Sequence, residues 1–315
     1  MANEFLNLTD LAKINTLDNA DRDISDLLDE APLLAMLPAD LASNGTTHKY
    51  VKQTGAPTVG FRAVNAGKEN KKSADTAVSE DLKYLDASFY VDVAVADGYR
   101  GGPEAYMARE AARQLKAAFS EYEQQIFYGT GNSASGVNGL ADDANLDGVG
   151  DLMVVNAAGT TASTGSSVWG IRATGDLNNV VSILGNDGQI EIGDITEQVI
   201  NDPTDVSLTL NVYAMKVAAY VGMQIGGAYS VARLANLTED SGKTLTDALI
   251  AELLEKFKAN QMPTHLAMSR RSLFQLQASR TATNATGSPA PIPIESFGVP
   301  IVPTDSITDT EALLA

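Results

Sequence analysis

The chain has 315 residues, 44% hydrophobic and 20% charged, which is typical of a folded protein with one large or two smaller cores and excludes a largely disordered chain. Its formal net charge of −18 at pH 7 repels the phosphate backbone of nucleic acids, so sequence-specific DNA binding is not expected. The sequence contains no cysteine and only two histidines, which excludes disulfides and cysteine metal sites and leaves little room for histidine chemistry.

Residues 1 to 45 are expected to form a polar, extended arm. They hold nine acidic residues against two basic ones, a net charge of −7. Short helical pieces are predicted around Ile24 and Leu27, and Pro32 and Pro38 interrupt them. The opening residues lack a basic segment followed by an apolar one, and no run approaches the roughly 18 apolar residues of a membrane span. Neither an export signal nor a membrane partner is therefore expected.

Residues 46 to 83 are expected to form a long projecting hairpin. Two runs with alternating apolar residues, HKYVKQT and TVGFRAV, flank a predicted turn at residues 55 to 57, and a polar stretch with three lysines near the predicted tip follows. This segment holds seven basic residues against four acidic ones, a net charge of +3. Such a reversal indicates either a solvated loop or a surface that meets an acidic partner. The candidate residues for a contact between subunits are Lys49, Lys52, Arg62, Lys68, Lys71 and Lys72.

Residues 84 to 140 are expected to combine a strand with one long helix. Alternation of apolar residues from position 89 to 95 predicts a half-buried strand within residues 82 to 97. The strongest helix signal runs from residue 103, a proline, to residue 128, before Gly129. Charged residues, Glu123 among them, are placed on the other faces of this helix. Its residues expected to pack against the sheet of the same subunit are Met107, Leu115, Tyr122 and Ile126.

The remaining residues alternate between β-like runs and helices. Residues 141 to 236 are rich in glycine, threonine, serine and asparagine and break into short apolar runs, which predicts a β-rich region. A helix is predicted to begin near Thr244, where Asp247 completes a capping pattern. A strand at HLAMS, a short helix at RRSLFQLQAS and a closing strand within SFGVPIVPTDSI follow. The mixture predicts an α+β protein. The apolar stripe of the predicted helix consists of Leu249, Leu253, Leu254 and Phe257.

One acidic stretch partly matches a calcium-binding loop at its first, third, fifth, sixth and ninth positions. Val154 stands where the bidentate glutamate is required, so a turn rich in aspartate and asparagine is the alternative explanation. The matching residues are Asp143, Asn145, Asp147, Gly148 and Asp151.

Other apparent motifs do not support catalysis. Residues 242 to 244 mimic the end of a phosphate-binding loop, but Leu237 stands where the first glycine is required, so helix capping is expected instead. Ser133 lies in a glycine-rich stretch without the nucleophile-elbow pattern. For His48 and His265 an ordinary hydrogen-bonded role is expected. The sequence therefore predicts no catalytic residue and no cofactor.

Several segments, in their order along the chain, resemble the Hong Kong 97-type major capsid proteins of tailed phages. The resemblance extends from about residue 46 to the C-terminus, and the order of the segments over most of a chain makes it specific. The segments are IFYGTGN at 126 to 132, GVNGL at 136 to 140, NAAGTTASTGSSVWGIRA, VGMQIGGAYSVARLANL and FGVPIVPTDSITDTEALL.

The resemblance implies an α+β, Hong Kong 97-type capsid fold with axial and peripheral domains, a long spine helix, an extended β-hairpin loop and an N-terminal arm. On that basis residues 1–45 are the arm and 46–83 the hairpin loop. Residues 84–140 are the peripheral domain with the spine helix, and 141–236 its β-rich insertion with return strands. Residues 237–315 are the axial domain and the closing strand.

The resemblance also implies a structural, non-enzymatic protein that self-assembles as hexamers and pentamers into the icosahedral head shell of a phage. The expected partners are the portal and scaffolding, decoration or protease proteins, with double-stranded DNA enclosed but not bound by sequence. The expected location is the virion, after assembly in the cytoplasm of a bacterial host. Two alternatives stay open: an encapsulin-like shell protein of a cellular nanocompartment, and an acidic, β-rich surface protein.

Overall fold

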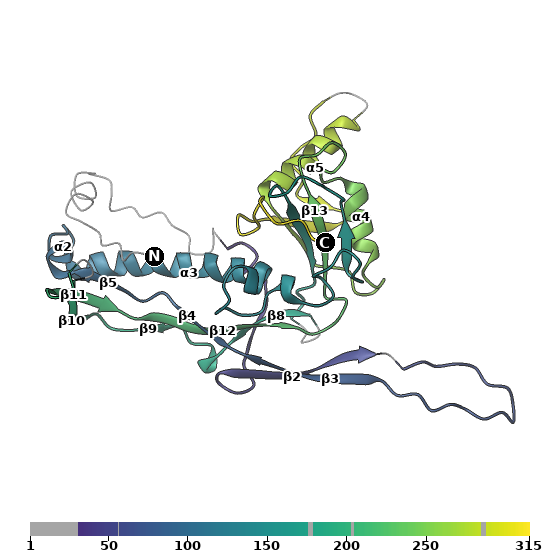
Figure 1. Cartoon of the computed structure of the whole chain (residues 1–315), viewed down its shortest axis with the longest axis horizontal. Coiled ribbons are helices and arrows are strands. Elements are labelled where there is room, and N and C mark those ends of the chain that lie inside the picture. The colour runs from purple at the N-terminus through teal and green to yellow at the C-terminus, as the bar shows by residue number, and fades with distance from the viewer. Residues whose placement is uncertain (1–30, 56, 176–178, 203–204, 285–287) are drawn as a thin grey trace.

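The computed structural model of the chain describes residues 31–55, 57–175, 179–202, 205–284 and 288–315. These residues form an elongated unit in which a long helix lies along a sheet, a second unit with its own sheet, and a projecting hairpin (Figure 1). The mixture of helices and sheets agrees with the predicted α+β class. Within the described residues, no helix combines the length and the apolar character needed to cross a membrane.

The predicted arm is described only from Ala31 onwards, so the helical pieces predicted around Ile24 and Leu27 lie outside the described residues. Strand β1 (Ala39–Leu41) pairs in parallel with β8 (Val180–Leu184). The end of the arm is therefore part of the sheet of the elongated unit.

Strands β2 (Thr47–Gly55) and β3 (Ala74–Asp81) form an antiparallel hairpin within residues 46 to 83. The turn predicted at residues 55 to 57 is wrong, because the run TVGFRAV forms no strand and the described loop reverses further out. There the backbone N–H of Ala66 donates to the carbonyl of Ala63 at 3.1 Å. An alternating pattern gives a strand only where a neighbouring strand pairs with it, and β2 pairs with β3 instead of with this run.

The long helix α3 (Pro103–Tyr128) begins and ends at the predicted residues. Proline suits its first turn, and Gly129, at φ 51°, ends it by donating its N–H to the carbonyl of Gln125. Gly129 packs against Gly139 so closely that a Cβ on either residue would overlap the backbone nitrogen of the other. This contact explains in physical terms why glycines stand in both IFYGTGN and GVNGL.

Helix α3 lies along a five-stranded sheet, and a three-stranded sheet lies at the far end of the same unit (Figure 1). The larger sheet contains β1, β8, β12 (Val217–Ile225) and β4 (Lys83–Asp86), with β9 (Glu191–Ile192) paired to β12. The smaller sheet contains β10 (Thr196–Asn201), β11 (Thr209–Met215) and β5 (Phe89–Asp92).

The single strand predicted within residues 82 to 97 is wrong beyond Asp92. Strands β4 and β5 are followed by a short helix, α2 (Val93–Asp97). The Asp92 carboxylate accepts a hydrogen bond from the N–H of Ala94 at 2.8 Å and so caps this helix. Apolar alternation continues through α2, but the cap ends the strand.

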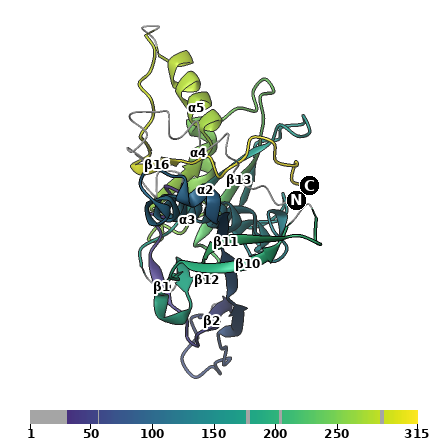
Figure 2. The same ribbon diagram turned by 90° about the vertical axis from the view of Figure 1, so that its left-hand side faces the viewer.

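The second unit is built on a six-stranded sheet next to helices α4 (Asp247–Glu255) and α5 (Arg270–Ala282) (Figure 2). Helix α4 begins two residues or more after the predicted start, because the side chain of Thr246, not Thr244, accepts from the N–H of Leu249. In spatial order the strands are β15 (Glu295–Ser296), β16 (Val299–Pro303), β14 (His265–Met268), β7 (Ser166–Ile171), β13 (Val231–Leu237) and β6 (Val154–Asn156).

Strand pairing crosses the boundary predicted at residue 236. Strands β6, β7 and β13 come from the segment predicted as an insertion of the peripheral domain, yet they share a sheet with the C-terminal strands β14 and β16. Periodicity predicts strands but not their distant partners.

The described short 3₁₀ helices are Gly129–Gly131, Leu140–Asp142 and Asn186–Gly188.

Candidate assembly surfaces

Polar contacts of His48 and Lys52 attach the hairpin to the elongated unit, and this part of the hairpin is called its root. His48 is buried, with its Nε2 2.5 Å from Oε1 of Gln224 on β12 and its Nδ1 accepting from the N–H of Ser43 at 3.2 Å. Nζ of Lys52 lies 3.2 Å from Oδ2 of Asp143, and both side chains are largely buried. The hydrogen-bonded role expected for His48 is therefore observed, whereas Lys52 binds a carboxylate of its own chain.

Burial shapes the electrostatics of the root. A cavity of about 440 Å³ lies between the hairpin and residues 138 to 145. Desolvation raises the pKa of the Glu80 carboxyl, which accepts a hydrogen bond from the Asn138 amide at 3.3 Å. Burial, together with the charge of Glu80, raises the pKa of Tyr50 to about 12. The base of the hairpin is thus attached to the elongated unit through partly buried polar side chains.

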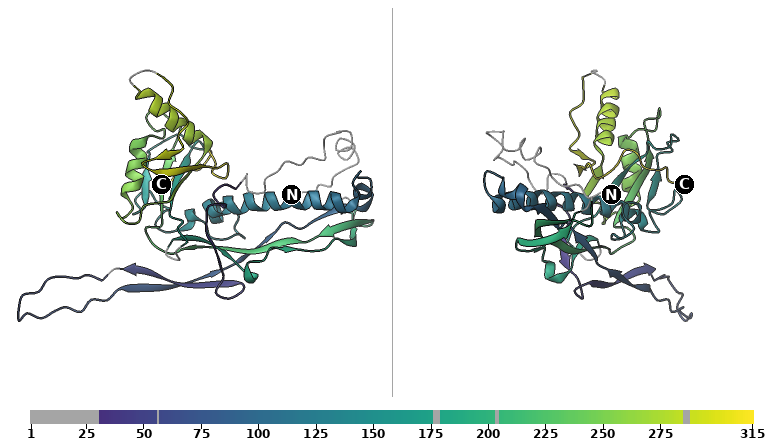
Figure 3. Two further views of the ribbon diagram at one scale, coloured as in Figure 1. Left: turned by 180° about the vertical axis from the view of Figure 1, so that it is seen from behind. Right: turned by 60° about the vertical axis from the view of Figure 1, so that its left-hand side comes forward.

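Beyond its root the hairpin continues as a loop, residues 57–73, which extends past the second unit and away from the end where α2 lies (Figures 1 and 3). The Arg62 guanidinium donates to the carbonyl of Ala66 at 2.8 Å, and Nζ of Lys71 lies 3.0 Å from the Glu69 carboxylate. Such exposed contacts contribute little stability. The exposed basic side chains of the hairpin include Lys49, Arg62, Lys68, Lys71 and Lys72.

The outgoing limb of the loop also exposes apolar side chains, which the sequence reasoning did not single out. Phe61 is fully exposed, and Val59 and Val64 are 83% and 91% exposed. The alternation of TVGFRAV was the available signal, because it places Val59 and Phe61 on one side of an extended chain. The outgoing limb thus exposes apolar side chains beside Arg62, whereas the exposed lysines Lys68, Lys71 and Lys72 lie on the return limb.

The residues predicted as the core of α3 are not equally buried. Met107, Tyr122 and Ile126 are buried, and the Tyr122 hydroxyl bonds Oγ of Ser182 and the carbonyl of Gly222 at 2.8 and 2.7 Å. Leu115 is only half-buried, because it lines an apolar cavity of about 210 Å³ next to α3. Leu115 packs against the cluster that contains Met107, but it is only partly buried there.

Glu123 is buried, although the sequence placed it on a face of α3 away from the predicted apolar stripe. Its carboxylate accepts hydrogen bonds from the N–H of Leu34 at 3.0 Å and from the hydroxyl of Thr304. The helix is covered here by the end of the arm and by the C-terminal segment, which periodicity does not reveal. Desolvation by this covering raises the pKa of Glu123.

The C-terminal segment is held in the second unit by a buried ion pair. Nη2 of Arg233 lies 3.1 Å from Oε2 of Glu311, and the guanidinium stacks on Trp169 at 4.8 Å. The same carboxylate accepts hydrogen bonds from Ser167 and Tyr128 at 2.6 Å. Burial and this neighbouring carboxylate raise the pKa of the Tyr128 hydroxyl.

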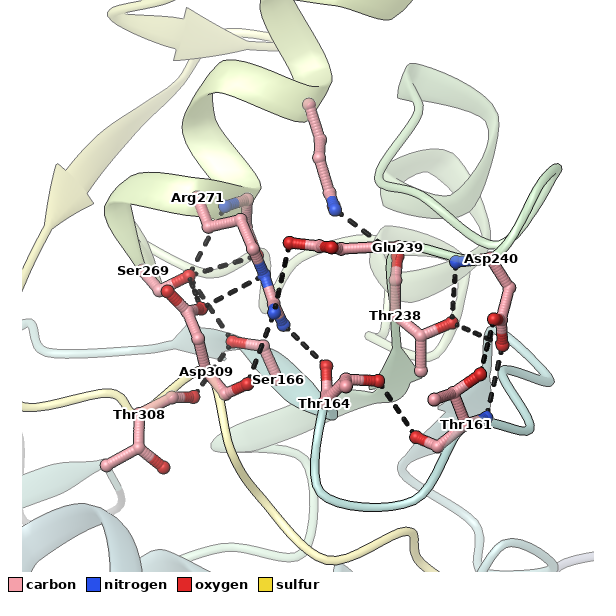
Figure 4. A network of polar contacts seen from close by, with 12 residues as sticks. Thr161, Thr164, Ser166, Thr238, Glu239, Asp240, Ser269, Arg271, Thr308 and Asp309 are labelled. Atoms are coloured by element: carbon pink, nitrogen blue, oxygen red, sulfur yellow. Dashed lines mark hydrogen bonds and ion pairs between the residues drawn. The ribbon is translucent and has the colours of Figure 1, made fainter.

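A polar network at the edge of the second unit ties three segments together (Figure 4). Arg271 on α5 donates to the carbonyl of Thr164 at 2.7 Å, and its Nε lies 3.3 Å from the Asp309 carboxylate. The Asp240 carboxylate accepts from the hydroxyl of Thr161 at 2.5 Å, and hydrogen bonds of this kind hold its pKa well below its usual range. These hydrogen bonds and ion pairs connect loops to one another. They do not form the paired nucleophile and base of a hydrolytic site.

The candidate calcium residues serve local structure instead. The Asp143 carboxylate accepts from the N–H of Asn145 at 3.0 Å and binds Lys52, and Asp151 accepts from the N–H of Gly148 at 2.6 Å. In the part of the chain that the structure covers, no three potential metal ligands converge. The candidate set is thus not brought together, and the alternative of a turn describes these contacts.

Comparisons with known proteins agree with this architecture. The family model of the major capsid protein GP7 matches residues 18–315. A chain of bacteriophage Epsilon15 is similar over 100% of this chain and 98% of its own, with a TM-score of 0.68 and 16% identity. The capsid of bacteriophage JBD30 has a TM-score of 0.48 and 12% identity, and the match covers 94% of this chain and 98% of that chain. The SrpI encapsulin of Synechococcus elongatus PCC 7942 has a TM-score of 0.46 and 12% identity, and the match covers 74% of this chain and 97% of that chain. No curated protein matches the sequence.

The Epsilon15 match confirms the predicted capsid fold, and the family model spans nearly the whole chain. The predicted function, a structural protein of the phage head shell and hence of the virion, is confirmed with it. The alternative of an acidic surface protein is set aside by the same match. The chain belongs to the major capsid protein GP7 family.

Proposed function

We propose that the chain builds a closed icosahedral head from hexamers and pentamers by extending the hairpin loop of each copy onto a neighbouring copy. The observation that carries this proposal is the loop at residues 57–73, which projects beyond both units (Figure 1). A two-stranded ribbon is at best marginally stable alone. Its order in a shell would come from lying on another subunit.

Charge favours a second copy as the receiving surface. The hairpin segment carries +3, whereas the whole chain carries −18, so loop and body attract each other across a subunit boundary. Each exposed pair contributes only about 0.2 to 1 kcal/mol, but the contact repeats at every subunit of a closed shell. Lys52 is engaged at the root, so the contact falls mainly to Arg62, Lys68, Lys71 and Lys72.

The two units take different places in this proposal. The unit with α3 and the five-stranded sheet is the peripheral domain, and the six-stranded unit is the axial domain at the centre of each capsomer. The separate sheets of the two units support this division. The shell, assembled in the host cytoplasm with portal, scaffolding, decoration or protease proteins, encloses double-stranded DNA without reading its sequence. The acidity of the chain disfavours adhesion to that DNA.

Particle formation and particle contents test the proposal. The chain is expressed in bacteria, particles are isolated by sedimentation, and negative-stain microscopy with nuclease protection follows. We expect closed shells from the chain, and nuclease-protected double-stranded DNA in virions that contain it. An enclosed enzyme in place of DNA would support the nanocompartment alternative, and a chain that stays monomeric under all assembly conditions would contradict the proposal.

A further inference from the structure

An aromatic side chain stands fully exposed on the projecting loop. Phe61 lies on the outgoing limb with Val59 and Val64, and all three side chains are almost wholly in water. An aromatic side chain contributes much of the binding energy of an interface because it can bury about 150 to 250 Å². Phe61 is therefore a candidate anchor for which the described part of this chain provides no cover.

The same chain carries an apolar cavity of suitable size. It has a volume of about 210 Å³ and lies between α3, the five-stranded sheet and the residues before β1. An apolar cavity of about 150 Å³ lined by aliphatic and aromatic side chains accepts a benzene molecule. The volume here is thus sufficient for one phenyl ring. The lining includes Leu34, Leu115, Phe119, Leu184, Ile190 and Val217.

We propose that Phe61 of one copy inserts its ring into this cavity of a second copy. The inference rests on the proposed function and names the contact that would carry it. A projecting group and a complementary cavity on different surfaces of one molecule make a heterologous contact, which repeats around rings and closed shells. The loop extends away from the elongated unit that holds the cavity, so the contact is between copies (Figure 3).

The loop and the rest of the chain carry opposite charge. Arg62 follows Phe61 in a hairpin segment with a net charge of +3, whereas the whole chain carries −18. The basic loop is therefore attracted to the acidic body of a second copy. In this arrangement the lysines of the return limb accelerate and orient docking, and the phenyl ring determines how long the contact lasts.

Truncation of the ring tests the anchor. For Phe61→Ala we expect unchanged circular dichroism of the subunit and a critical concentration for shell assembly that rises about tenfold or more. The control is Phe61→Leu, which keeps a large apolar side chain at the same position and should keep most of the assembly. Assembly of Phe61→Ala at the wild-type concentration would overturn the proposal while leaving the proposed function intact.

Filling the cavity from within tests the receiving surface. Ala118 on α3 lines the cavity and is 9% exposed, so Ala118→Leu should occupy part of the space meant for the ring and weaken assembly of a folded subunit. The control, Ala117→Leu, changes the preceding, exposed residue. If the two groups touch, the double variant with Phe61→Ala should assemble about as well as the weaker single variant. Fully additive losses would mean that Phe61 and the cavity act separately and would contradict the contact.

A disulfide locates the contact directly, because the natural chain has no cysteine. Subunits with Phe61→Cys are mixed with subunits with Ile190→Cys at a concentration above the raised threshold expected when the ring is missing. Ile190 lies at the cavity and is 39% exposed. We expect an oxidant to join unlike subunits in assembled shells. Phe274→Cys in place of Ile190→Cys should give no such product. Shells that form normally without the expected disulfide would overturn the proposal, whereas wild-type protein that forms no shells would instead contradict the proposed function.

Discussion

Arg233 and Glu311 form an ion pair inside the second unit, with Nη2 and Oε2 3.1 Å apart and both side chains less than a tenth exposed. Glu311 lies near the C-terminus and Arg233 on β13, so the pair fastens the final segment to the sheet. Removing one partner of a buried pair leaves an uncompensated charge in a medium of low dielectric constant. Loss of either side chain should therefore weaken the packing of the C-terminal segment against the sheet.

Glu311→Ala should lower the free energy of unfolding by about 3 to 5 kcal/mol. The control is Asp305→Ala, which breaks the exposed pair with Arg270 and should cost no more than about 1 kcal/mol. Urea denaturation of unassembled subunits measures both values. Equal, small losses in the two variants would show that the buried pair does not hold the C-terminal segment.

Glu123 should make the stability of the subunit depend on pH. Burial raises the pKa of its carboxyl in the folded state, so the folded chain holds this proton at pH values where the unfolded chain has lost it. Stability therefore falls as the pH rises from the unfolded pKa through the folded pKa. In Glu123→Gln this loss is absent. Relative to wild type, Glu123→Gln should be more stable at pH ~7 than at pH ~4, on either side of the ordinary glutamate pKa.

Urea denaturation at the two pH values measures this difference. The matched control is Glu121→Gln, because Glu121 lies exposed on the same helix two residues earlier. Its stability relative to wild type should change little between the two pH values. The same pH dependence in both variants would contradict a specific contribution from the buried carboxyl.

Met107 and Leu115 should differ in their contribution to stability. Met107 is completely buried in the cluster around Phe89 and Val91, so Met107→Ala should cost about 2 to 5 kcal/mol. Leu115 already borders a cavity, so Leu115→Ala should cost less. Met107→Asp should leave the protein insoluble, and Leu115→Asp should do so to a lesser degree. Thermal unfolding and soluble yield measure the order, and a larger loss at Leu115 would contradict this description of α3.

These contrasts show which parts of the structure local sequence determines. Helix α3 was predicted to its terminal residues because a proline at its start and Gly129 at its end act within one turn. The turn of the hairpin was misplaced, because TVGFRAV has the period of a strand but no partner. The sharing of one sheet by β7 and β14 depends on contacts across about 100 residues, which no short pattern encodes.

The candidate surfaces follow the same rule. The basic loop was predicted because charge is read from the sequence directly, whereas the engagement of Lys52 by Asp143 depends on the fold. Arg233 offered a signal that was missed: a charged residue within the apolar run VARLANL requires a buried partner. Glu123 gave no such signal, because the segments that bury it lie far from it in sequence.

The basic return limb of the loop should control assembly without contributing to the fold. Lys68, Lys71 and Lys72 are exposed, and the ion pair between Lys71 and Glu69 stays within the loop. Changing all three lysines to glutamate reverses the charge that meets an acidic neighbour. The triple variant should therefore keep the circular dichroism of the wild type but form fewer shells, or none, because like charges now face each other.

Salt provides the internal test of this explanation. At an ionic strength of about 1 M the Debye length falls to about 3 Å, so the difference between the triple variant and the wild type should shrink. The control changes the same three lysines to arginine, which keeps the charge and should keep assembly. Sedimentation and negative-stain microscopy measure the yield of shells at low and high salt. Normal shells from the glutamate variant at low salt would mean that Lys68, Lys71 and Lys72 belong to a solvated loop, and a loss of shells that salt does not reduce would mean that their effect is not electrostatic.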